Sequence, residues 1–168
     1  MADTKHAVIR TDAMAGTDVR DQLISVKFMG SDGSTATAID NGNIVKVGGL
    51  VDGERNIFVG SAPVDGDTIK DLAVIASEEI DYEHNHANLE DFQNEAGATC
   101  RGYRLHSGSI FSVTAEAIEG TKTVGDSVEI SAGNTKLNTV GTATAASIGK
   151  LIAIETASRF TYYVIQID

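Results

Sequence analysis

The stretch Gly108–Gly120, GSIFSVTAEAIEG, decides the fold class of this chain of 168 residues. Its apolar side chains fall on alternate positions, at Phe111, Val113, Ala115 and Ala117, with polar residues between them. Successive side chains of an extended strand point to opposite faces, so this spacing is typical of a β-strand with one buried face. We therefore expect a half-buried strand here, with turns at its glycine ends.

Short apolar runs of this strand type recur along most of the chain. Short apolar runs are separated by glycine, aspartate or asparagine, and the chain has 17 glycines but one proline. The runs are QLISVKF (22–28), NIVKVGG (43–49), RNIFVGSAP (55–63), DLAVIASEE (71–79), GDSVEISAG (125–133), GKLIAIET (149–156) and FTYYVIQID (160–168). Many short strands with frequent turns predict a mainly β fold, a compact sandwich or barrel.

One segment interrupts this pattern between the two β-rich halves. Leu89, Phe92 and Ala96 recur at helical spacing, and Asn88 is a suitable N-cap residue. We therefore expect one short inserted α-helix at about 88–96.

The first residues of the chain are polar and lack a clear period. Residues 1–22 are interpreted as an extended N-terminal arm that orders on a partner, followed by a single β-rich domain over 23–168. The alternative is an edge strand at Ala7–Thr11 followed by a loop, and the sequence leaves both open.

The two β-rich halves also resemble each other. GNIVKVGG from Gly42 parallels GDSVEISAG from Gly125, and IKDLAVIAS from Ile69 parallels IGKLIAIET from Ile148. This suggests a duplicated β-unit over 39–80 and 109–168, although chance similarity among β-rich strings is an alternative.

Composition and charge argue against several classes of protein. The formal net charge of -11 repels phosphate backbones, so we expect no nucleic-acid partner. No apolar run reaches the length of a membrane span, and the N-terminus lacks the apolar core of a signal peptide. Cys100 is the only cysteine, so no intrachain disulfide forms, and we interpret it as a buried hydrophobe. We expect assembly in a host cytoplasm.

Two histidines raise the question of a metal site. His84 and His86 lie among acidic residues that include Glu83, and His106 could join them. Their spacing matches neither the zinc-finger patterns nor HExxH, so a solvated loop is the simpler interpretation. We predict no catalytic, cofactor-binding or metal-binding residue and no enzyme activity. A metal-dependent hydrolase using these residues is kept as the alternative.

Several segments resemble small head proteins of tailed bacteriophages, the decoration, cement or head-fibre proteins. The resemblance extends from about Ile39 to the C-terminus, and NEAGATCRGYRLHSGSIFSVTAEAIEG (94–120) is its most distinctive part. It is also carried by NGNIVKVGGLVDGERNIF (41–58), DLAVIASEE (71–79), VGDSVEI (124–130) and IGKLIAIETASRFTYYVIQI (148–167).

The resemblance implies a compact β-rich virion protein without enzyme activity. Such proteins bind the major capsid protein on the outer surface of the expanded head and stabilise it. Many are homotrimers, so a homo-oligomer, most simply a trimer, is expected. The predicted insertion at 88–96 departs from the small decoration trimers and puts the trimer and its docking position in doubt. A tail-tube or connector component is a further structural alternative.

Within the predicted arm, five residues are candidates for contacts with the capsid. A strand added to a capsid edge would gain affinity from backbone hydrogen bonds and specificity from side chains. The candidates are Lys5, His6, Val8, Ile9 and Arg10. We expect that deleting residues 1–12 weakens capsid binding without unfolding the domain.

Overall fold

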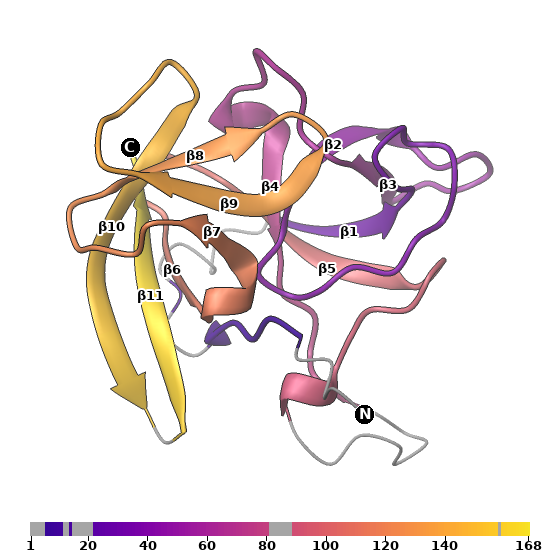
Figure 1. Ribbon diagram of the computed structural model, residues 1–168. Coiled ribbons are helices and arrows are strands. Elements are labelled where there is room, and N and C mark those ends of the chain that lie inside the picture. Colours follow the sequence, from indigo (N-terminus) through magenta and orange to yellow (C-terminus); the bar gives the residue numbers. More distant parts are fainter. Residues whose placement is uncertain (1–5, 12–13, 15–21, 81–88, 158) are drawn as a thin grey trace.

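The protein is built from two β-units that lie side by side (Figure 1). The computed structural model describes residues 6–11, 14, 22–80, 89–157 and 159–168. Eleven strands and three single-turn 3₁₀ helices are formed by these residues. The mainly β architecture predicted from the alternating pattern is therefore confirmed. No helix within the described ranges is long and apolar enough to cross a membrane.

The first unit is a closed barrel of five strands in the order β1-β3-β2-β4-β5. β1 and β3 are parallel, and the other neighbours are antiparallel. A single 3₁₀ turn, η2 (Ile69–Asp71), leads into β4. The strands are β1 (Leu23–Phe28), β2 (Ile44–Leu50), β3 (Ile57–Ser61), β4 (Leu72–Ile75) and β5 (Thr99–Arg104).

The interior of this barrel is narrow, because glycine stands at two positions where the neighbouring strands approach Val26 closely. Val26 on β1 is fully buried between Gly60 on β3 and Gly102 on β5. A Cβ atom added at Gly60 would lie 2.6 Å from a methyl carbon of Val26, and one at Gly102 would lie 3.0 Å away. Larger side chains at these two positions would overlap with Val26, because interiors are close-packed.

The second unit is a six-stranded sheet in the order β6-β11-β10-β8-β9-β7. The strand expected across 108–120 is broken, because Ala115–Ala117 forms the 3₁₀ turn η4 between β6 and β7. The strands are β6 (Ile110–Val113), β7 (Ile118–Gly120), β8 (Ser127–Ser131), β9 (Asn134–Val140), β10 (Ser147–Ala157) and β11 (Phe160–Ile167).

The strand order of the first unit recurs in the second. β7-β9-β8-β10-β11 repeats β1-β3-β2-β4-β5, with the parallel pair at the same place. The hydrogen bonds recur as well: Gly42 N donates to Ile75 O at 2.7 Å, and Gly125 N donates to Leu151 O at 2.8 Å. Gly42 and Gly125, which the two sequence segments align, therefore occupy equivalent places. Ile75 corresponds to Leu151, so the sequence alignment that places Ile75 opposite Ile154 is wrong by three positions.

The two units differ in the length of the segment that pairs with the last strand of the unit at one end and with the parallel strand at the other. Gln22 and Ser109 accept equivalent backbone hydrogen bonds from β5 and β11, and Phe28 and Ile118 pair with equivalent positions of β3 and β9. Gln22 and Phe28 of the first unit are six positions apart, whereas the equivalent Ser109 and Ile118 of the second unit are nine positions apart. The difference equals the three residues of η4. β6 and β7 together therefore take the place of β1, interrupted by an insertion.

The N-terminal segment lies along the edge of β6 that the insertion leaves open. Ile9 forms an antiparallel bridge with Val113, Arg10 N donates to Ser112 O at 3.0 Å, and Thr114 N donates to Val8 O at 3.0 Å. The side chains of Ala7, Val8 and Ile9 are buried. The described residues 6–11 thus follow the edge-strand alternative rather than an arm projecting from the domain.

The expected α-helix at 88–96 is wrong. Only Leu89–Asp91 forms a single 3₁₀ turn, η3, and Asn88 lies outside the described residues. Further on, Asn94 pairs with Ile39 in an antiparallel bridge, and its side-chain Nδ2 donates to Asn41 Oδ1 at 3.0 Å. These buried hydrogen bonds hold the segment extended, and tertiary pairing overrides weak helical spacing.

A shared core joins the two units. Ile44 and Leu72 point outward from the first barrel and pack in one cluster with Val128, Leu151 and Ile165 of the second unit. The N-terminal Ile9 belongs to the same cluster. Since burying such a side chain contributes roughly 1.5–3 kcal/mol, these contacts bind the units into one body.

Candidate functional site

The structure separates the candidate contact residues of the N-terminal segment. Val8 and Ile9 are core residues, not surface contacts. His6 is partly buried, with Nδ1 2.9 Å from Asp40 Oδ1. The Arg10 guanidinium lies 5.6 Å from the centre of the Tyr162 ring. Lys5 lies outside the described residues.

The histidine cluster is only partly covered by the structure. Glu83, His84 and His86 lie outside the described residues. His106 is exposed, and its Nδ1 lies 3.1 Å from Arg104 O in the connection between β5 and β6. Within the part of the chain that the structure describes, no group of three potential metal ligands comes together.

Cys100 is buried, as predicted from the sequence. The structure places its side chain in the core of the first barrel, together with Val26, Val45 and Ile75. Burial raises the pKa of the Cys100 thiol to about 11, because the charged thiolate is disfavoured away from water. The thiol is therefore not activated as a nucleophile.

The β10–β11 hairpin extends beyond the rest of its sheet. β8 pairs with β10 only as far as Lys150, whereas β10 and β11 stay paired to Ala157 and Phe160. Among the described residues, no strand lies along the outer edge of Ile152–Ala157. Figure 1 shows the hairpin as the long yellow ribbon at the edge of the molecule.

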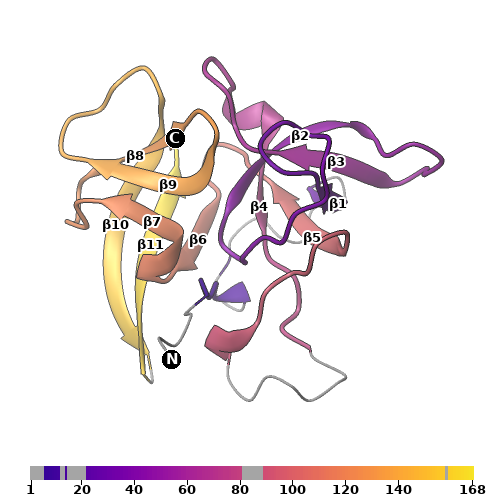
Figure 2. The same cartoon turned by 45° about the vertical axis from the view of Figure 1, so that its right-hand side comes forward.

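This hairpin and the η3 turn lie at the same end of the molecule. Both reach its lower end in Figure 1, and the rotated view of Figure 2 agrees. Three of the eight large hydrophobic side chains exposed in the described ranges belong to them: Leu89 on η3 and Ile152 and Ile154 on β10. We call residues 89–91, 152–157 and 159–161 together the hairpin end.

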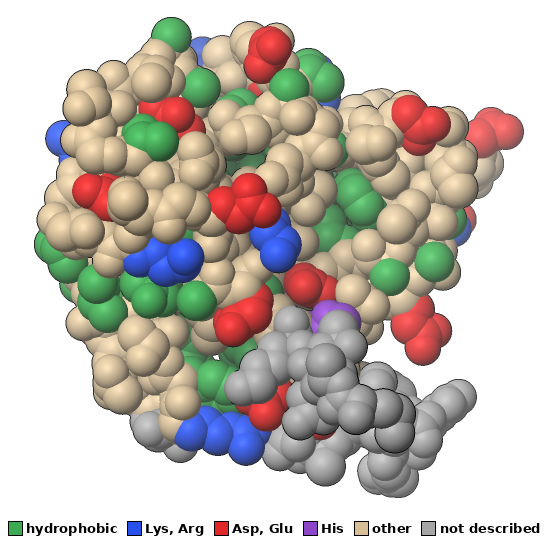
Figure 3. Space-filling view, in the orientation of Figure 1, with side chains coloured by type: hydrophobic (Ala, Val, Ile, Leu, Met, Phe, Trp, Pro, Cys, Tyr) green, Lys and Arg blue, Asp and Glu red, His purple; other side chains and the backbone are tan. Residues whose placement is uncertain are grey.

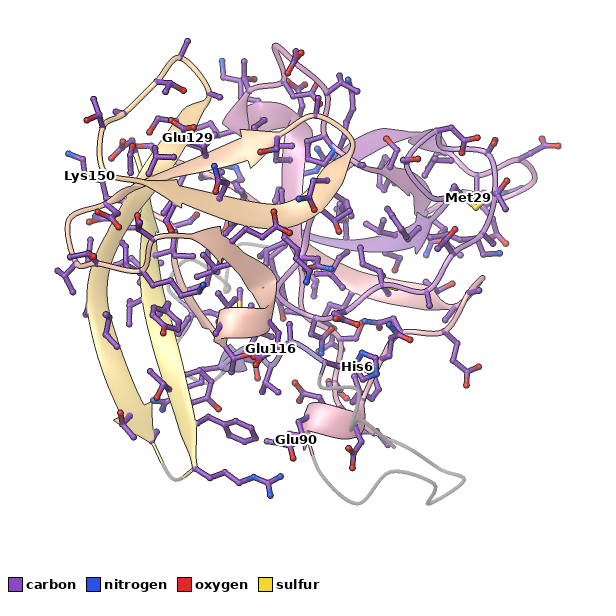
Figure 4. All side chains as sticks on the ribbon, viewed as in Figure 1. His6, Met29, Glu90, Glu116, Glu129 and Lys150 are labelled. Atoms are coloured by element: carbon purple, nitrogen blue, oxygen red, sulfur yellow. The ribbon has the colours of Figure 1, made fainter. Side chains whose placement is uncertain are left out.

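A cleft of about 380 Å³ opens at the hairpin end. The space-filling view shows its mouth, rimmed by acidic and basic side chains (Figure 3). Glu116, Glu90 and His6 lie around it in the stick view (Figure 4). The cleft is lined by the N-terminal strand, η3, η4 and the hairpin tip through His6, Glu90, Thr114, Ala115, Glu116, Arg159, Phe160 and Thr161.

The charges of the cleft are incompletely paired. Arg159 Nη2 lies 3.7 Å from Glu90 Oε1, beyond hydrogen-bond distance, and its guanidinium lies 5.1 Å from the centre of the Phe160 ring. Glu116 is half-buried and makes no hydrogen bond or ion pair with the residues that the structure describes. The cleft thus combines three groups: Glu90, whose contact with Arg159 is long, Glu116, which has no partner among the described residues, and the aromatic ring of Phe160. Of the residues that line the cleft, only His6 was predicted from the sequence as a contact residue, because the fold assembles the cleft from four separate segments.

A wider groove lies on the first unit, along β1, β3 and β5. It measures about 840 Å³ and includes Leu23, Arg55, Phe58 and Arg101. The Arg101 guanidinium is paired with Glu78 Oε1 at 2.7 Å. Because Arg101 is already paired with a carboxylate, the groove is the weaker candidate for binding a charged partner.

Comparison with known proteins gives no relative. No family model matches the chain, and no curated protein or solved structure shows significant similarity to it.

Proposed function

We propose that this protein is a structural virion protein that binds the outer surface of a bacteriophage capsid and stabilises the expanded head. The observation that carries the proposal is the outer edge of β10 at the hairpin end, along which none of the described strands pairs. It adds to the resemblance of the sequence to phage head proteins. The partner is the major capsid protein, and the protein acts by binding and not by catalysis.

An unpaired strand edge is an unusual surface to leave open. It presents a row of backbone N–H and C=O groups that can pair with another strand, and soluble proteins usually protect such edges. Along Ile152–Ala157 the only charged residue is Glu155, while Ile152 and Ile154 are 38% and 43% exposed. A capsid strand added here would gain main-chain hydrogen bonds and cover both isoleucines.

The acidic exterior fits the same role. A net charge of -11 keeps a protein soluble at the high copy number of a capsid coat and away from phosphate backbones. A homotrimer presenting three hairpin ends would hold the shell more firmly than one copy, because linked sites bind with avidity.

Co-sedimentation with capsids of the parent phage, stripped of this protein, tests the proposal. Saturable binding of the wild-type protein to expanded heads, and not to compact proheads, is expected. The Ile152→Asp, Ile154→Asp double variant should lose most of this binding, because it places two charges where apolar contact is proposed. The absence of wild-type binding to either form would overturn the proposal.

A matched control separates the hairpin from general surface effects. Leu50 is 48% exposed and ends β2 in the first unit, away from the hairpin end. The Leu50→Asp variant should bind expanded heads as the wild type does. Equal losses in the control and the hairpin variant would refute the hairpin as the docking element.

A further inference from the structure

We infer that the cleft at the hairpin end receives a basic side chain, lysine or arginine, from the protein that docks there. The inference rests on the proposed function and specifies the chemistry of its partner. It is carried by Glu116 together with the walls of the cleft, which come from the N-terminal strand, η3, η4 and the hairpin tip.

Glu116 lies on a part of the second unit that has no counterpart in the first unit. It is the central residue of η4, the insertion that the second unit has and the first unit lacks. The first unit closes as a barrel without such a turn. The insertion therefore adds a carboxylate at the cleft rather than serving strand pairing.

A half-buried carboxylate without a partner favours a cation. Partial burial removes some of the water that hydrates the carboxylate. A positive group compensates for this lost hydration by forming a charge-assisted hydrogen bond. Among the described residues that line the cleft, Arg159 is the only lysine or arginine, and it is directed at Glu90 and at the ring of Phe160. Glu116 and Glu90 thus leave the cleft with an excess of negative charge.

The remaining walls suit the stem of a long basic side chain. Phe160 offers an aromatic face, Ala115 an apolar surface and Thr161 a hydroxyl group. Lysine and arginine place their methylene groups on apolar surface and keep their charge at a polar site. A carboxylate or phosphate would meet the two glutamates, and an apolar side chain would leave Glu116 without a partner.

The first test uses the full-length protein and small probes. Nα-acetyl-arginine amide, Nα-acetyl-lysine amide and the uncharged Nα-acetyl-norleucine amide are titrated while backbone amide NMR signals are followed. We expect the cationic probes to shift the signals of Ala115, Glu116 and Thr161 saturably, and the two probes will distinguish guanidinium from ammonium. Equal shifts with the norleucine probe would overturn the inference.

Two isosteric variants locate the binding charge. Glu116→Gln should weaken binding of the cationic probe roughly tenfold, as expected for the loss of one charge-assisted contact. Glu54→Gln removes the same charge at an exposed turn of the first unit and should leave binding unchanged. Unchanged binding in Glu116→Gln would also refute the proposed site.

The capsid assay separates this inference from the docking proposal. If Glu116→Gln binds expanded heads about tenfold more weakly than the wild type, both stand. If both proteins bind equally, the receptor for a basic side chain is refuted while docking remains. If the probes bind but the wild-type protein ignores capsids, the docking proposal fails and with it the assignment of the partner.

Discussion

Val26 shows at the residue scale how the first barrel can close with only five strands. Its side chain occupies the space that side chains on β3 and β5 would otherwise fill, and glycine stands at both facing positions. A glycine in a strand interior weakens the strand, so its presence here reflects the need for close approach.

Gly60→Ala should therefore destabilise the protein. The new methyl group would lie 2.6 Å from a Val26 methyl carbon, and overpacking of this kind costs about 1–3 kcal/mol. Urea unfolding measures the change. The cost should fall when Val26→Ala is present as well, because that substitution removes the clashing atoms. Gly49→Ala is the control, since a Cβ atom there meets nothing within 4 Å.

Cys100 provides a test that depends on pH. Its thiol pKa is raised from 9.0 to about 11 in the folded protein, so the folded state keeps a proton that the unfolded state loses. The free energy of unfolding is thus unaffected by this group below about pH 9 and decreases as the pH rises toward 11. Compared with Cys100→Ala, the wild type should lose stability over this window, as followed by urea unfolding at each pH. An identical pH profile for the two proteins would contradict the buried position of the thiol.

At the scale of elements, the N-terminal strand is part of the sheet system. The N-terminal strand pairs with the edge of β6 through the bridge between Ile9 and Val113. In the first unit the equivalent edge, on β1, is paired with β3. The earlier expectation that residues 1–12 can be removed without unfolding does not fit this arrangement, because Ala7, Val8 and Ile9 lie in the core.

Ile9→Ala should lower the free energy of unfolding by about 2–4 kcal/mol, the usual cost of truncating a buried isoleucine. Leu50→Ala, at an exposed position of β2, should change it by less than about 0.5 kcal/mol. Chemical denaturation of both variants provides the comparison. Similar, small changes in both would mean that the N-terminal strand is not part of the stable core.

Strands could be predicted from the sequence where the pattern of apolar residues fits only one type of element. Alternation in 108–113 and the glycine-bounded runs predicted strands, because the period of two is a local property of an extended chain. Prediction from the sequence failed at Asn94, where a buried amide and a two-way backbone bridge to Ile39 decide the conformation. It also missed the break at Ala115–Ala117, since alternating alanines satisfy a strand and a tight turn equally well.

The candidate site was harder to predict than the fold. Glu90, Glu116 and Arg159 are far apart in the sequence and meet only when the hairpin tip approaches η3 and η4. No spacing rule connects such residues. Ala7, Val8 and Ile9 form too short a run to distinguish a core strand from an exposed arm.

At the scale of the whole molecule, the two units share one hydrophobic core. The outward face of β2 and β4 packs on the inward face of the second sheet, so neither unit buries its apolar surface alone. Partial unfolding of one unit would expose the core residues of the other.

The protein should therefore unfold in a single cooperative transition. Far-UV circular dichroism and tyrosine fluorescence should give coincident urea curves. Val26→Ala, in the core of the first barrel, should lower hydrogen-exchange protection in β11 of the second unit as much as in β5. Loss of protection confined to β5 would show that the units are energetically independent.

The pairing of the first residues with β6 also has a consequence for biosynthesis. Val8 and Thr114 are hydrogen-bonded across 106 positions, so during translation Val8 must wait for much of the chain to be made before its partner exists. Contacts of such sequence separation slow folding, because the intervening chain has to be ordered first. The first barrel has all of its strands by Arg104, yet its outward apolar face stays uncovered until β11 is made. The nascent chain is thus most vulnerable to misassociation during translation of its second half, before β11 is made.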